Sequence, residues 1–119
     1  MNDWTKEFPA GITVCNNEGV LLEMNDKAAK IFASDGGREL IGKNLRECHP
    51  ELARLKVEKL ISGKDKNIYT IEKNGVKKLI VQLPWYSEGE FAGFVELSIE
   101  LPEEIPNFVR QLTSNQEDL

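Results

Sequence analysis

The side chains in this sequence best suited to chemistry are the neighbours Cys48 and His49. His49 is the only histidine, and Cys15 is the only other cysteine. An imidazole at the start of a helix could bind haem iron, and a thiolate there would have its pKa lowered by the helix terminus. Alternatively, His49 could cap backbone N–H groups and do no chemistry. Cys48 and His49 are therefore candidate cofactor-binding residues, with a structural cap as the alternative.

Other motifs that carry chemistry are missing from the sequence. It has no Ser/His/Asp arrangement, no phosphate-binding loop of the G-x-x-x-x-G-K type and no second Cys/His cluster to complete a zinc site. Cys15 and Cys48 form no C-x-x-C pair, so we expect two free thiols. The sequence predicts a protein that is not an enzyme and has no metal site.

Composition narrows the class of protein further. A chain of 119 residues is the size of one domain. Its net charge of -5 disfavours nucleic-acid binding, which needs clustered Lys and Arg. No apolar run is long enough to span a membrane, and the first residues lack the features of a signal peptide. We therefore expect a cytoplasmic domain that binds neither nucleic acid nor membrane.

The first half of the chain predicts two strands and two helices. Apolar residues alternate around Ile12 and Val14, a turn follows at 16–19, and a second apolar run covers 20–24. Asn25 is placed to begin a short helix. A second helix is predicted from Pro50 to Gly63, because Pro is tolerated at the first helical position and Gly ends helices.

The second half predicts three strands. From Asn67 the apolar period is two, and Asn74-Gly75 is a strong signal for a type I′ hairpin. The returning strand covers 76–85, and the last strand covers 91–99 after a turn at 87–90. Strands, short helices and then strands indicate an α+β fold in which helices pack on one face of a five-stranded antiparallel sheet.

This order of elements resembles a PAS domain (sensory box). The resemblance covers residues 8–104, with residues 1–7 as an N-terminal segment and 105–119 as a short C-terminal helix and tail. The segment Gly42-Lys43-Asn44-Leu45-Arg46-Glu47-Cys48-His49-Pro50 is similar to the Gly-x5-Cys-His-Pro segment of a PAS subgroup found in bacterial and archaeal proteins with hemerythrin-like regions. Where other PAS cores end in Asp-Ile-Thr, this sequence has Glu100-Leu101-Pro102.

The resemblance implies signal transduction, with a small-molecule ligand held in an apolar cavity between sheet and helices. The candidate cavity residues are Ile12, Val14, Ile31, Phe32, Leu45, Leu55, Leu60, Ile68, Thr70, Leu83, Val95 and Leu97. Thr70 or Gln82 could orient a ligand. A flavin is not expected, since the stretch 52–62 lacks the cysteine of photoactive PAS domains. The alternative is that these side chains fill the core completely.

Five aromatic or apolar residues are candidates for a dimer or partner surface: Trp4 and Phe8 at the N-terminal segment, and Ile80, Tyr86 and Phe94 on the outer face of the sheet. The terminal helix could cover them instead. Three functions follow: a ligand sensor that signals through homodimer or partner contacts to an effector on another chain, a protein-interaction module with a packed core, or a haem sensor using His49.

Overall fold

The computed structural model of the chain describes residues 2–45, 59–60, 63 and 65–112. Its elements follow the order α1 (Asp3–Lys6), β1 (Gly11–Asn16), β2 (Leu21–Met24), α2 (Asp26–Ile31), η1 (Ala33–Asp35), η2 (Gly37–Leu40), β3 (Asn67–Lys73), β4 (Val76–Ser87) and β5 (Glu90–Glu100). The predicted α+β fold is confirmed.

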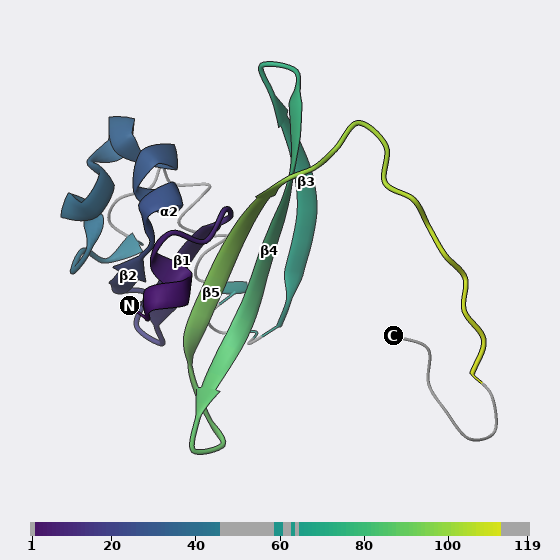
Figure 1. The fold of residues 1–119 in the computed structure, drawn as a ribbon. Helices are drawn as coiled ribbons and strands as arrows, with labels where there is room; N and C mark the ends of the chain where they lie inside the picture. Colours follow the sequence, from purple (N-terminus) through teal and green to yellow (C-terminus); the bar gives the residue numbers. More distant parts are fainter. Residues whose placement is uncertain (1, 46–58, 61–62, 64, 113–119) are drawn as a thin grey trace.

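The five strands form one antiparallel sheet in the order β2-β1-β5-β4-β3. The last strand therefore lies in the middle, between β1 and β4. Figure 1 shows α2 and the two 3₁₀ helices, η1 and η2, gathered beside the β1–β2 end, while the long β3, β4 and β5 extend past them. Among the described residues, no helix is long and apolar enough to cross a membrane.

The hairpin that joins β3 and β4 has the predicted turn. Asn74 and Gly75 both have positive φ, 53° and 79°, as a type I′ turn requires. The β4–β5 turn repeats this geometry with Glu88 at 52° and Gly89 at 80°. Both turns match the right-handed twist of the strands that they connect, so local sequence sets these two hairpins.

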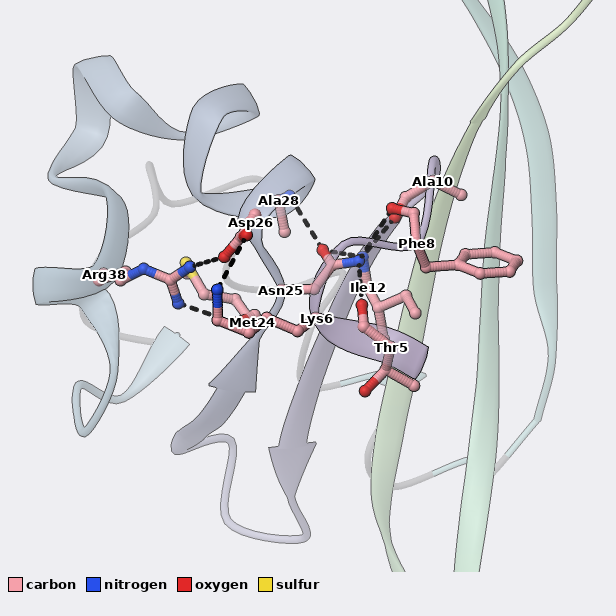
Figure 2. Close-up of polar contacts among 10 residues, drawn as sticks. All are labelled: Thr5, Lys6, Phe8, Ala10, Ile12, Met24, Asn25, Asp26, Ala28 and Arg38. Carbon is pink, nitrogen blue, oxygen red and sulfur yellow. Dashed lines mark hydrogen bonds and ion pairs between the residues drawn. The ribbon is translucent and has the colours of Figure 1, made fainter. Parts of the chain in front are cut away.

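Asn25 begins α2 and also holds the N-terminal segment against it. Its side-chain oxygen accepts from the backbone N–H of Ala28 at 3.0 Å, the helix cap, and from that of Ile12 at 2.9 Å. Its amide nitrogen donates to the carbonyls of Thr5 at 3.0 Å and Ala10 at 2.8 Å (Figure 2). With 1% of its surface exposed, Asn25 connects three segments through buried hydrogen bonds.

Two small apolar clusters lie within the described core. One contains Leu21, Met24 and Ala28, and the other contains Cys15 and Phe94. Leu45 packs against both. The helix α2 lies so close to β1 that a Cβ on Gly11 would come within 2.9 Å of the Ile31 side chain. The helical layer therefore covers the side of the sheet to which Gly11 belongs.

The segment after β5 differs from the prediction. The Leu101 N–H donates to the Lys77 carbonyl at 2.8 Å, and residues 102–112 then continue without helix, away from the sheet (Figure 1). The predicted C-terminal helix is therefore not formed in residues 105–112. An isolated helix of this length is unstable in water unless it packs on a surface, and this segment is exposed along its length.

Candidate functional site

The strand register assigns every sheet residue to one of two faces. Residues directly opposite each other on neighbouring strands share a face, and successive residues alternate. Gly11 faces α2 and pairs with Ser98, which pairs with Ile80, which pairs with Tyr69. These residues define the helix-facing side of the sheet, and we call the other side the open face.

A line of polar side chains crosses the helix-facing side. Thr13 pairs with Glu96, Glu96 with Gln82, and Gln82 with Asn67, so the four residues lie side by side on β1, β5, β4 and β3. We call these four residues the polar row. All four are partly buried. Buried layers of small domains are mostly apolar, so a polar line across this side of the sheet is unusual.

Hydrogen bonds connect three members of the polar row. The Asn67 side-chain amide donates to Gln82 Oε1 at 2.9 Å, and Gln82 Nε2 donates to Glu96 Oε1 at 2.7 Å. A carboxylate only accepts, so Glu96 requires the Gln82 nitrogen to point toward it. Gln82 must then present its oxygen to Asn67. Glu96 therefore sets the orientation of both amides.

Apolar side chains flank the polar row. Phe94 lies two residues before Glu96 on β5, and Ile80 lies two residues before Gln82 on β4. They are 6% and 7% exposed. Because low-polarity surroundings weaken the screening of charge, Glu96 acts on its neighbours more strongly here than it would in water.

The pKa values of two neighbouring groups report this environment. Burial raises the pKa of Tyr69, and the negative charge of Glu96 raises it further. Burial also raises the pKa of the Cys15 thiol, with a smaller contribution from Glu96, while a hydrogen bond with the Phe94 backbone acts in the opposite direction. Cys15 is a free thiol, as predicted, but the raised pKa makes it a poor nucleophile.

The open face is apolar and half-buried. Its central members are Leu79, Val81, Leu83, Val95, Leu97 and Ile99. Trp85 is on the same face and donates its indole N–H to the Cys15 carbonyl at 2.9 Å. This bond reaches from β4 to β1 across β5, at the position of Gly93. A Cβ on Gly93 would lie 1.9 Å from that same carbonyl oxygen, so only glycine fits there.

No family model matches the chain, and no curated protein matches its sequence. Solved structures match its fold. The PAS domain of BvgS from Bordetella pertussis is 24% identical, with 83% of this chain and 82% of that chain covered and a TM-score of 0.60. A sensory box sensor histidine kinase from Vibrio cholerae is 16% identical, with 81% and 85% covered and a TM-score of 0.59. The Aer2 receptor from Vibrio cholerae, a dual PAS-heme oxygen sensor, is 15% identical, with 78% and 95% covered and a TM-score of 0.55.

This chain has the PAS fold. The agreement confirms the predicted family resemblance at the level of the fold. The Gly-x5-Cys-His-Pro subgroup stays a prediction, because Cys48, His49 and Pro50 lie outside the described residues.

The predicted cavity residues of this PAS fold divide between the two sides of the sheet. Four of them belong to the helical layer: Ile31, Phe32, Leu45 and Leu60. Seven lie on the open face: Ile12, Val14, Ile68, Thr70, Leu83, Val95 and Leu97. The expectation that these seven converge with the helices is wrong. Leu55 lies outside the described residues.

Two of the predicted partner-surface residues are on the wrong side. Ile80 and Phe94 belong to the helix-facing side and are buried. The reason is that β4 and β5 carry apolar residues on both faces, so alternation alone does not identify the face that the helices cover. The polar residues Glu96 and Ser98 favour solvent for their side of β5, and by alternation this pattern places Phe94 and Ile80 there with them. The signal that could have corrected this is Gly11, which has no side chain to hold α2 away.

The other three predicted surface residues are exposed. Trp4 is 67% exposed and Phe8 41%, and their rings meet edge to face with centroids 5.8 Å apart. Tyr86 is 56% exposed and its ring contacts Phe91, whose ring contacts Phe94. Tyr86 therefore lies at the solvent end of an aromatic row that leads into the core.

Proposed function

We propose that this PAS domain is a sensory module that holds a small ligand against the helix-facing side of the sheet and signals through dimer or partner contacts on the open face. The observation that carries the proposal is the polar row. Its members are partly buried and three of them hydrogen-bond to one another. A ligand seated between sheet and helices would supply partners for their remaining donors and acceptors.

The neighbouring structures support a sensory role. BvgS contributes a PAS domain, one Vibrio cholerae neighbour is a sensor histidine kinase, and Aer2 is an oxygen sensor that contains haem. These proteins differ in what they sense, so the ligand of this chain follows from its own residues. A haem ligand would depend on His49, with Cys48 beside it, and both lie outside the described residues.

The open face supports signalling through dimer or partner contacts. Taken alone, it also supports a different function, that of a protein-interaction module with a packed core. Ile68 is 52% exposed and Leu83 38% on a face whose central residues are apolar. Contiguous apolar surface of this kind marks interaction sites. A homodimer or an effector on another chain would cover it.

Native mass spectrometry of protein purified without denaturation tests both halves. We expect a mass above that of the 13.5 kDa chain, together with a dimer. A visible absorption spectrum of the same sample identifies haem if a Soret band is present. Protein that carries no added mass contradicts the ligand half and leaves the interaction module.

Two adjacent substitutions on β4 separate the two faces. Gln82→Leu removes the centre of the polar row and should abolish the ligand mass while the dimer persists. Leu83→Gln makes the open face polar and should weaken the dimer while the ligand mass persists. The proposal is contradicted if Leu83→Gln, and not Gln82→Leu, releases the ligand.

A further inference from the structure

The polar row has hydrogen-bonding groups that a ligand could use. Gln82 uses its oxygen for Asn67 and one N–H for Glu96. Glu96 Oε2 and Asn67 Oδ1 are acceptors that have no partner among the residues that the structure describes. The second N–H of Gln82, the second N–H of Asn67 and the Thr13 hydroxyl are further groups of the row that could bind a ligand, so hydrogen-bonding capacity alone does not select its class.

The charge of Glu96 selects a ligand that donates. Among the described residues, Glu96 forms no ion pair with Lys or Arg. Glu96 is partly buried beside Phe94 and Ile80, where a counter-charge acts more strongly than in water. A positively charged nitrogen placed against Glu96 would supply that counter-charge and would form the stronger, charge-assisted class of hydrogen bond.

We propose that the polar row recognises a small ligand that carries a protonated nitrogen, with Glu96 as the counter-charge. The proposal rests on the proposed function, because it names the ligand class of the same site. Amidinium, guanidinium and aromatic ammonium groups have this chemistry.

Three probes of one shape and different charge test the proposal on the full chain: benzamidine, benzamide and benzoate. Each is titrated while the backbone amide signals of Thr13, Gln82 and Glu96 are followed by two-dimensional NMR. We expect benzamidine to shift these signals saturably and to bind at least about tenfold more tightly than benzamide, the ratio that one charge-assisted hydrogen bond provides. Benzoate should not shift them.

Substitution of Glu96 is the second test of the proposal. Glu96→Gln keeps an oxygen for Gln82 but removes the charge, so benzamidine affinity should fall to that of benzamide. The matched control is Glu100→Gln, on the same strand and face but exposed and paired with Lys27, which should change benzamidine affinity less than twofold.

Each outcome has a distinct meaning. If benzamide or benzoate shifts the three signals as strongly as benzamidine, the ligand class is wrong while a ligand site remains. If none of the probes shifts them, the proposed ligand class is also overturned, and native mass spectrometry separately decides whether the domain carries a ligand. If Glu96→Gln binds benzamidine as tightly as the unsubstituted chain, Glu96 is not the counter-charge.

Discussion

Replacement of Asn25 by alanine should destabilise the domain more than the loss of a cap on a six-residue helix would. The change removes the cap on Ala28, which costs about 1 kcal/mol. It also leaves the Ile12 N–H and the Ala10 carbonyl without the partners that they have at 2.9 and 2.8 Å. Each such orphaned group costs about 1 kcal/mol or more when buried. The sum is about 3–4 kcal/mol, a large part of the roughly 5–15 kcal/mol typical of a domain.

Urea unfolding followed by tryptophan fluorescence measures this loss. With a slope of about 1–3 kcal/mol per molar, the midpoint should fall by about 2 M. Asn25→Ser keeps a cap oxygen but is too short to reach the other partners, so it should recover about 1 kcal/mol of the loss. Asn17→Ala, in the exposed turn after β1, is the matched control and should stay within about 0.5 kcal/mol.

The reasoning would be refuted by either of two results. One is a loss below about 1 kcal/mol in Asn25→Ala, which would mean that water or a local shift replaces the lost bonds at little cost. The other is an Asn25→Ser variant that is no more stable than Asn25→Ala, which would mean that the helix cap contributes nothing.

Two further predictions concern the sheet. Gly93→Ala should lower the free energy of unfolding by about 3 kcal/mol or more, because its Cβ would overlap the Cys15 carbonyl. Gly75→Ala should lower it by only about 1–2 kcal/mol, because Gly75 has positive φ but no atom within 4 Å of the added Cβ. Equal urea midpoints for the two variants would contradict the close approach at Gly93. Tyr69 should titrate above its ordinary pKa, so that the stability due to its neutral form is lost as pH rises from about 10 through the folded pKa. Glu96→Gln should lower that pKa, and a tyrosine NMR titration in which the substitution leaves it unchanged would show that Glu96 does not act on Tyr69.

The elements of the sheet could be predicted because their signals are local. The alternation around Ile12 and from Asn67 onward identifies strands, and Asn74-Gly75 can adopt the turn that joins two of them. Asn25 is an ordinary helix cap that sequence alone suggests. Each of these signals depends on neighbours within a few residues, so no knowledge of the tertiary structure was needed.

The side of the sheet that faces the helices could not be predicted in the same way. On β4, Ile80 and Val81 are adjacent and equally apolar, so either could belong to the core. The choice is made by α2, which lies against Gly11 on a strand far away in the sequence. A shift of one residue exchanges the two faces, and for this reason the cavity prediction failed on the strands while the fold prediction succeeded.

The prediction for residues 105–112 failed for a related reason. Four apolar residues at helical spacing indicate a helix only if a surface receives them. In the structure these residues have no such surface: Ile105 is 60% exposed, and Val109 is 87% exposed. Spacing alone carries no information about whether a receiving surface exists.

The central position of β5 also constrains how the chain can fold as it is synthesised. The β1–β2 and β3–β4 hairpins each emerge from the ribosome before β5, the strand that joins them. Gly11 on β1 cannot pair with Ser98, nor Lys78 on β4 with Glu100, until β5 has been synthesised. Until then β1 and β4 both expose edges that can pair with other chains. Formation of the sheet is therefore a late, single event dominated by contacts between distant residues, which are slow to form. A chain stalled on the ribosome before residue 100 would therefore present two separate hairpins with unpaired edges, and not a partly folded domain.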